Sequence, residues 1–214
     1  MLITTASVIN DPVTTTDELI PSGDTSSYRS NPEKLSSFAL SRKDPGYVGR
    51  AKAVRTLEQR RLAGQEIEEL SELYAVISTV SDAKPSDIML GSLICAKKPG
   101  DGSAREQAAS CQRVLGGVAN IANEYATKRY RSNLINWGIL PFTFDGELPV
   151  ETGDHIYLTG VRAALETGKT EIIGKIITKD LKISGEITLK LENLSKDDRQ
   201  ILLDGCLINY YKVN

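Results

Sequence analysis

The sequence has few residues of the kinds that hold metals. It contains three cysteines (Cys95, Cys111 and Cys206) among 214 residues, and no two of them form a Cys-x-x-Cys pair. It therefore carries no recognisable zinc or iron–sulfur motif, and the cysteines are too scattered for a disulfide framework. The single histidine, His155, excludes chemistry that rests on two or three histidines. We interpret the cysteines as core residues and His155 as a surface or turn residue.

Long apolar runs are also missing. No window approaches eighteen consecutive apolar residues, so no membrane span is expected, and the start of the chain lacks the basic region of a signal peptide. With free cysteines, the expected compartment is the cytoplasm. The 26 basic and 28 acidic residues leave a net charge of -2, which argues against a basic nucleic-acid coat or an acidic disordered tail. A local basic pocket remains compatible with this balance.

The middle of the chain alternates between helical and strand-like patterns. The predicted order is irregular chain over 1–50 with a short helix at 31–40, amphipathic helices over 51–80 broken at Gly64, a buried strand at 88–95, a glycine loop at 99–102, a helix at 103–115, a strand at 118–122, a helix at 127–137 and a strand at 139–144. Strands that alternate with helices in this way predict an α/β layer with parallel pairing. The 51–80 helices are interpreted as an insertion.

The last third of the chain has a different pattern. Segments 155–158, 171–178 and 186–191 are rich in Ile, Thr and Leu, with turns expected at Gly168 and Gly185. They predict antiparallel strands. Residues 195–203 predict a final helix capped by Ser195. We expect a single domain over 1–214, with a parallel strand–helix core and β-rich flanks.

One stretch, Gly100–Gln107, carries candidate chemistry. Gly100 and Gly102 let the backbone approach a ligand closely. Ser103 falls at a predicted helix N-terminus, where free N–H groups and the helix dipole favour negative charge, and Arg105 can hold a carboxylate with two hydrogen bonds. The same N–H groups would stabilise a serine alkoxide, so Ser103 could act as a base. The stretch therefore predicts an anion-binding corner at the end of a strand.

Local alternatives stand beside this interpretation. Ser103-x-x-Glu106 also has the form of a capping box, a common device at helix starts. The run Lys128–Arg131 mixes basic and aromatic residues and could bind RNA, although a solvated helix face is the favoured interpretation. Trp137 is expected in the core or at a contact with a partner domain.

Four segments together resemble the aconitase superfamily. Gly100–Gln107 is similar to its Gly-x-Gly-Ser-Ser-Arg-Glu-His signature, and Arg113–Gly117 to its Pro-Arg-x-Leu-Gly segment. Ser132–Phe142 is similar to Thr-Asn-Leu…Gly-Leu-Leu-Pro-Leu, and Thr15–Gly23 to Thr-Thr-Asp-His-Ile-Ser…Gly. The four occur in the family's order, which makes the resemblance specific.

The resemblance implies the swivelling β/β/α domain found at the C-terminus of aconitase-like hydro-lyases. In that family a [4Fe–4S] cluster on separate domains or a large subunit acts on hydroxy di- or tricarboxylic acids. By position, Ser103 would be the catalytic base and Asp17 would support acid–base work. Arg105 would bind a substrate carboxylate, beside the signature positions Gly102 and Ala104, and Arg42 would be a second substrate arginine, placed by spacing. No metal would be bound by this chain, which alone would be inactive.

Three positions depart from the family pattern. Ala104 replaces a signature serine, Gln107 replaces the signature histidine, and Glu18 replaces another histidine. These changes leave the substrate open. The leading hypothesis is a divergent aconitase-like hydratase domain or small subunit. The alternatives are the small subunit of isopropylmalate isomerase or homoaconitase, and a carboxylate-binding or regulatory module that kept the fold without catalysis.

Overall fold

The computed structural model describes residues 1–213, and its seven longer strands close into a barrel in the order β1-β3-β5-β6-β9-β8-β7. Four strands run parallel: β1 (Leu2–Ile9), β3 (Leu90–Ala96), β5 (Gly117–Ala122) and β6 (Leu140–Thr143). The predicted parallel pairing of the middle segments is confirmed. The expectation that residues 1–50 are irregular is wrong for β1, whose pairing with β3 is non-local.

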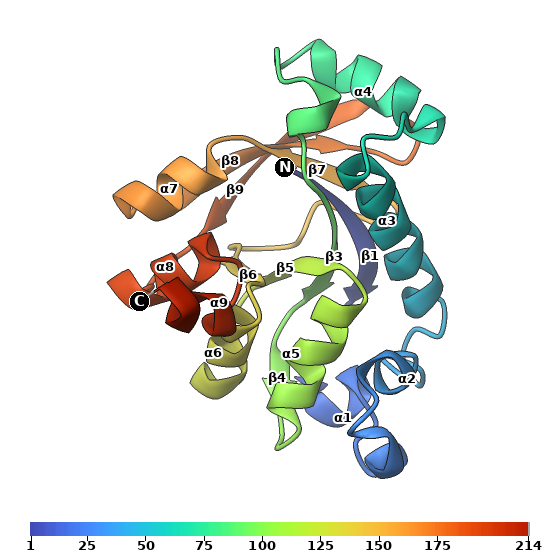
Figure 1. Ribbon diagram of the computed structural model, residues 1–214, viewed down its shortest axis with the longest axis vertical. Coiled ribbons are helices and arrows are strands. Elements are labelled where there is room, and N and C mark those ends of the chain that lie inside the picture. Colours follow the sequence, from blue (N-terminus) through green and yellow to red (C-terminus); the bar gives the residue numbers. More distant parts are fainter. Residues whose placement is uncertain (214) are drawn as a thin grey trace.

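Helices cover the parallel strands on the outside of the barrel (Figure 1). They are α3 (Tyr47–Leu62), α5 (Arg105–Val114) and α6 (Lys128–Asn136). The predicted break at Gly64 is confirmed, because this glycine has a φ of 70° and α3 ends just before it, with α4 (Ser71–Ser78) following. The short helix α2 (Pro32–Ser36) begins as predicted, with the Asn31 side chain accepting from the Lys34 N–H group at 3.0 Å.

The antiparallel strands close the barrel. They are β7 (His155–Leu158), β8 (Glu171–Ile177) and β9 (Ile183–Lys190), and β7 pairs with β1 while β9 pairs with β6. The predicted antiparallel pairing is confirmed, but the turn expected at Gly185 is wrong. That residue lies inside β9, and the chain reverses at Leu181, whose φ is 60°. Gly168 ends a helix that was not predicted, α7 (Val161–Thr167).

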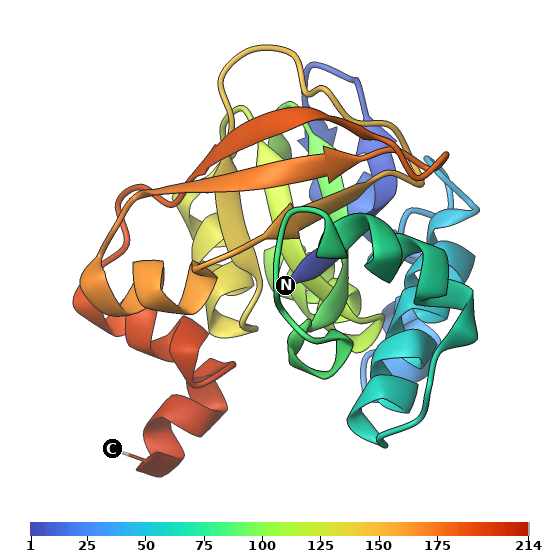
Figure 2. The same ribbon diagram turned by 90° about the horizontal axis from the view of Figure 1, so that it is seen from above.

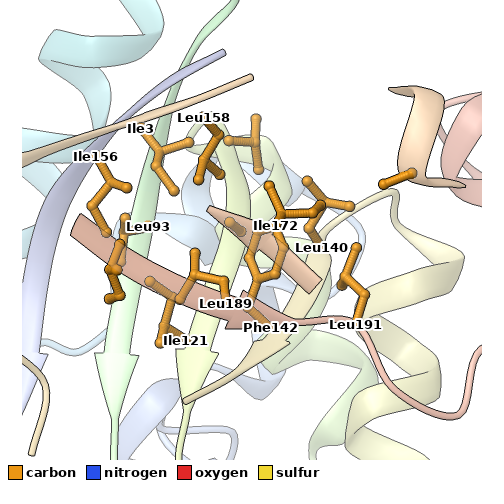
Figure 3. Packing of buried hydrophobic residues seen from close by; sticks show 14 of the residues in the cluster. Ile3, Leu93, Ile121, Leu140, Phe142, Ile156, Leu158, Ile172, Leu189 and Leu191 are labelled. Carbon is orange, nitrogen blue, oxygen red and sulfur yellow. The ribbon is translucent and has the colours of Figure 1, made fainter. Parts of the chain in front are cut away.

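The barrel interior is filled by branched apolar side chains from both halves (Figure 3). Ile3, Leu93 and Ile121 come from parallel strands, and Ile156 and Leu189 from antiparallel ones, and all are at most 1% exposed. Such burial excludes water from the barrel and fixes the register of the strands. The loops at the carboxyl ends of β3 and β5 are therefore held on a rigid frame.

The chain ends in helices α8 (Lys196–Leu203) and α9 (Leu207–Val213), which lie beside α6 in Figure 1. The cap predicted at Ser195 is confirmed, because its hydroxyl accepts from the Asp198 N–H group at 3.0 Å. Cys95 and Cys111 are buried as predicted, whereas Cys206 is only partly buried. Across residues 1–213, no helix is long and apolar enough to cross a membrane.

Candidate functional site

The glycine loop after β3 is fixed by contacts on both sides. Its strand β4 (Pro99–Asp101) pairs in parallel with β2 (Thr14–Thr15). Gly100 has a φ of 98°, and a Cβ atom added there would lie 2.2 Å from the ring of Tyr130. Only glycine fits this position, because it combines the left-handed conformation with direct packing on an aromatic ring.

Ser103 does not cap the helix that follows. Helix α5 begins at Arg105, its N-cap is Ala104, and no side-chain cap hydrogen bond forms. The side chain of Glu106 is engaged elsewhere, since it accepts from Trp137 Nε1 at 2.6 Å and from the Asn133 side-chain amide. The capping-box interpretation is therefore wrong, and Ser103 is exposed at the helix start.

Ala104 and Gly102 shape the loop through their backbones. Ala104 is only 7% exposed, and its N–H group donates to Thr16 Oγ1 at 3.3 Å. Gly102 has a φ of 124°, and a Cβ atom there would lie 2.4 Å from the same Thr16 oxygen. These contacts hold the start of helix α1 (Thr16–Leu19) against the loop that carries Ser103.

Three cations surround Ser103. Arg105, Lys128 and Arg129 line an open cavity of about 440 Å³, together with Ser103, Glu106, Ser132 and Asn133. Within the described residues 1–213, none of the three forms an ion pair. Glu106 is the cavity's acidic residue, and its carboxylate is already occupied by Asn133 and Trp137. The cavity therefore offers unpaired positive charge to an anion.

The start of α6 is tied to the glycine loop, which places Lys128 and Arg129 beside Ser103. Thr127 Oγ1 accepts from the Tyr130 N–H group at 3.1 Å and donates to the Gly100 carbonyl at 3.2 Å. Tyr130 is buried, contrary to its interpretation as part of a solvated face, whereas Lys128 and Arg129 are exposed as expected.

The Tyr130 hydroxyl lies in a buried polar network. It receives hydrogen bonds from Gln112 Nε2 at 2.9 Å and from Asn120 Nδ2 at 3.0 Å. Burial raises the pKa of Tyr130 to about 12, with the two amide contacts opposing the shift. The hydroxyl therefore stays protonated at neutral pH and acts as a structural support beneath Gly100.

Asp17 and Arg42 meet in an ion pair next to this cavity. Arg42 Nη1 lies 2.9 Å from Asp17 Oδ2, and a second nitrogen of the guanidinium contacts Asp24. Neither Asp17 nor Arg42 lines the cavity of Ser103. The structure thus brings Ser103 and Arg105 together and places Asp17 and Arg42 as a paired neighbour, joined to them through the Thr16–Ala104 hydrogen bond.

Helix α1 is held by a capping box in which Glu18 takes part. Thr15 donates its backbone N–H group to Glu18 Oε2 at 2.7 Å, and Thr15 Oγ1 accepts from the Glu18 N–H group at 3.2 Å. The hydrogen bond from the Thr15 backbone lowers the pKa of Glu18, with burial opposing and Lys43 adding to the effect. Glu18 therefore has a local role that keeps Asp17 in place.

The residues of this chain do not fit a metal cluster. In residues 1–213, no three histidine, cysteine, aspartate or glutamate side chains converge on a point where an ion could bind. Cys95 and Cys111 are both buried, and burial raises the pKa of both thiols, in the case of Cys111 to about 12. His155 lies on β7 with its Nδ1 atom 3.0 Å from Thr4 Oγ1, rather than in a turn.

Sequence reasoning placed none of Lys128, Arg129, Ser132 and Asn133 in the Ser103 site, and interpreted Lys128 and Arg129 as a solvated helix face with RNA binding as the alternative. The available signal was their position after strand β5, because the carboxyl ends of neighbouring parallel strands meet at one edge of a sheet. Lys128 and Arg129 start the helix after β5, just as Arg105 starts the helix after β3 and β4.

Comparisons with known proteins match part of this chain to a described family. Residues 52–147, which include Ser103 and all three cavity cations, match the family described as aconitase C-terminal domain. Mitochondrial homocitrate dehydratase of Saccharomyces cerevisiae is 33% identical over 136 residues, covering 61% of this chain and 16% of that protein. Aconitate hydratase A of Rickettsia prowazekii is 29% identical over 153 residues, covering 69% of this chain and 17% of that protein. The chain thus spans less than one fifth of these relatives.

The fold is also found in a solved structure. The crystal structure of 3-isopropylmalate dehydratase from Methanocaldococcus jannaschii superposes with a TM-score of 0.53 at 23% sequence identity. The superposition covers 100% of this chain and 95% of the other. At this level of identity the likeness shows a shared fold.

Proposed function

We propose that this chain, whose residues 52–147 match the aconitase C-terminal domain family, supplies a base and carboxylate-binding cations to a hydro-lyase site completed by a second domain or subunit. Its substrate would be a hydroxy di- or tricarboxylic acid. Ser103 would take the proton next to a carboxylate, and Arg105 would bind that carboxylate. The relatives named above are a dehydratase and a hydratase, which supports the reaction class.

One observation carries the proposal. A serine that is free of any capping role stands at the start of α5, in a cavity lined by Arg105, Lys128 and Arg129. In a purely structural helix start, the serine would bond to the backbone as an N-cap. The free hydroxyl and the unpaired cations are what a proton transfer beside a carboxylate requires.

The chemistry follows from charge. Removing a proton beside a carboxylate builds further negative charge, and interactions that strengthen as it develops lower the barrier. The first N–H groups of α5 have no intrahelical acceptor and point toward the loop that holds Ser103. One well-placed donor of this kind is worth about 3–4 kcal/mol in a transition state. Arg105 adds a planar fork that matches a carboxylate.

Lys128 and Arg129 would bind a second carboxylate of the substrate. They lie in the cavity with Arg105 but come from a different helix, so the positive charge is spread over the opening. Asp17 and Arg42 would join the site at its edge. Arg42 is already paired with Asp17 and Asp24, so a substrate carboxylate would have to displace one of these acids.

The [4Fe–4S] cluster of the family would belong to the partner domain or subunit, because the residues of this chain do not fit it. Its expected contribution there is Lewis acidity toward the substrate hydroxyl. This chain would handle only the proton and the carboxylates, and would be inactive alone.

The direct test is reconstitution with the cluster-bearing partner from the same organism. Dehydration of citrate, homocitrate and isopropylmalate would be followed with wild type, Ser103→Ala, Arg105→Met and the control Ser26→Ala. Ser26 is exposed and lies in a short 3-10 turn. We expect Ser103→Ala to lower kcat by at least about 100-fold, by analogy with loss of other proton-transfer groups. An unchanged rate would overturn the role of Ser103.

A binding test separates catalysis from recognition. Citrate titrated into the chain with its partner, followed by calorimetry, should bind with an affinity that falls at least about tenfold in Arg105→Met. Binding that depends on Arg105 without turnover of any substrate would favour the regulatory module. Binding that ignores Arg105 would remove this residue from the site.

A further inference from the structure

A second cavity lies at the other end of the parallel strands. Its volume is about 660 Å³, and its lining includes Met89 before β3, Val118 in β5, Leu140 in β6 and Leu158 at the end of β7. The first three positions are at the amino ends of parallel strands, and Leu158, at the carboxyl end of the antiparallel β7, lies at the same edge beside Met1. Ser103 follows the carboxyl ends of the parallel strands. Helices α7 and α8 and the segment 81–89 complete the wall, and Figure 2 shows them on either side of the N-terminus. The volume falls in the range of pockets that hold small organic ligands.

The floor of this cavity is apolar. It is formed by five aliphatic side chains that are each at most 9% exposed, namely Val118, Leu140, Leu158, Leu165 and Leu202. Met89 is 36% exposed at the cavity wall. Methionine and leucine surfaces of this kind adapt to apolar bodies of varied shape.

One cation faces this apolar wall without a counter-charge. Arg113, in the last turn of α5, is partly buried, and its Nη1 atom reaches only the Gly117 carbonyl, at 3.5 Å. Within residues 1–213 its guanidinium forms no ion pair with a carboxylate. Burial lowers the pKa of Arg113. A partly desolvated guanidinium with one weak acceptor retains most of its capacity to bind an anion.

The other charged and polar groups of the lining are already engaged or lie at its edge. Arg162 is 75% exposed and pairs with Glu166 at 3.0 Å. Asp87 is exposed and contacts Ser86 Oγ. Ser81 Oγ bonds to the Tyr157 hydroxyl at 2.8 Å, and the Met1 nitrogen donates to the Leu158 carbonyl at 2.9 Å. Burial lowers the pKa of the Met1 ammonium to about 6, so at neutral pH this group is mostly uncharged. Among the described residues, Arg113 is thus the group of this lining that keeps its positive charge without an acidic partner.

We propose that this cavity binds an organic anion with an apolar body, its acidic group on Arg113 and its body against Val118, Leu140 and Leu158. The site is separate from the Ser103 cavity and shares none of its lining residues. Its occupant would be a single amphipathic acid, recognised by one charge and one apolar surface.

The test compares two fluorescent probes that have similar aromatic rings and differ in charge. Anilinonaphthalene sulfonate carries one sulfonate on an aromatic body, and phenylnaphthylamine has the same rings without the sulfonate. Each would be titrated into wild type, Arg113→Met, Arg113→Lys and the control Lys169→Met, which removes one positive charge from an exposed loop outside the cavity. Near-ultraviolet circular dichroism would show that each variant is folded.

We expect one sulfonate probe per chain, with affinity at least about tenfold lower in Arg113→Met and unchanged in Lys169→Met. The neutral probe should bind wild type and Arg113→Met alike. If Arg113→Met fails to fold, the comparison of the two probes on wild type and Arg113→Lys still shows whether binding depends on the charge of the probe. Amide shifts in nuclear magnetic resonance should cluster at Val118 and Leu140.

Two results would overturn the proposal. One is equal affinity of wild type for the charged and neutral probes, which would show that the cavity binds apolar bodies without recognising the anionic group. The other is a set of amide shifts centred on Ser103 and Lys128, which would place the anion in the cavity at the opposite end of the strands.

Discussion

The stability of the Ser103→Ala variant tests whether Ser103 has a structural role, because a serine that caps a helix stabilises the fold and a serine with a free hydroxyl does not. The serine is exposed and precedes the N-cap residue Ala104, and helix α5 has no side-chain cap. Ser195 is the matched control, because its hydroxyl accepts from the Asp198 N–H group at 3.0 Å and completes a capping box at α8. The two substitutions are chemically identical, so they differ only in the hydrogen bond that is lost.

The expected magnitudes differ clearly. Loss of a serine N-cap costs about 1 kcal/mol, within a range of about 0.5–2 kcal/mol. For a chain of this size, 1 kcal/mol corresponds to a Tm decrease of roughly 2–4 °C. Ser195→Ala should therefore lower Tm by about this amount, whereas Ser103→Ala should stay within the roughly ±0.5 kcal/mol of a neutral surface change.

The assay is urea unfolding of the chain alone, with calorimetry for Tm, on wild type and both variants at one pH. Because no partner or substrate is needed, the result does not depend on the proposed reaction. Equal losses for the two variants would show that Ser103 caps α5 in solution, and would refute the inference that its hydroxyl is free for chemistry.

Three further predictions concern the surroundings of the site. Glu18→Gln should make the free energy of unfolding depend less on pH in the acid range. The hydrogen bond from the Thr15 backbone lowers the pKa of Glu18, so the ionised carboxylate stabilises the folded wild type above pH about 4.3. Wild type loses this stabilisation as pH falls through the pKa of Glu18 in the folded state. Urea midpoints at pH 7, 4 and 3 measure it, and parallel curves would contradict it. Gly100→Ala should cost about 2–4 kcal/mol, because its Cβ would lie 2.2 Å from the Tyr130 ring at a φ of 98°; thermal unfolding checks this, and a neutral result would be inconsistent with the packing. Glu106→Gln should shift the fluorescence of Trp137, the single tryptophan, since the indole donates to that carboxylate at 2.6 Å; an unchanged spectrum would count against the contact.

The parallel half of the barrel could be predicted from sequence because its signals are local. Strand β3 is a mainly apolar run, interrupted by Ser92, that is buried along its whole length. Gly138 ends its helix with a φ of 69°, a conformation that glycine adopts without strain. These elements carry both their start and their stop signals within a few residues.

Strand β1 could not be predicted, because its polar residues are buried through distant partners. Ser7 is fully buried, and its hydroxyl donates to Asp44 Oδ2 at 2.7 Å, a residue 37 positions away. Thr4 bonds to His155 at 3.0 Å across the junction with β7. The four central residues of β1, Thr4–Ser7, are small or polar, and they interrupt its apolar residues in the sequence. The closure itself is a non-local pairing that no local pattern encodes.

The residues of the candidate site also differ in whether local sequence identifies them. Ser103 and Arg105 could be predicted because one short motif holds both. Lys128 and Arg129 were not placed there: their position after β5 indicates only the edge of the sheet, and the Thr127 hydrogen bond to Gly100 sets them beside Ser103. A charge run on a helix is ambiguous in sequence, and the fold assigns two of its members to a cavity and a third, Tyr130, to the core.

Arg42 shows why a residue assigned by spacing needs its partners before it is given a role. An unpaired arginine would meet a substrate carboxylate at full charge, as Arg105 can. Arg42 instead holds Asp17 at 2.9 Å and also contacts Asp24. The Arg42 side chain is 53% exposed, and exposed pairs of this kind are worth about 0–1 kcal/mol. Exchange of one acid for a substrate carboxylate would therefore cost little, and it would release Asp17 only when substrate arrives. In the proposed site, Arg42 would hold Asp17 as well as bind a carboxylate, whereas Arg105 would only bind a carboxylate.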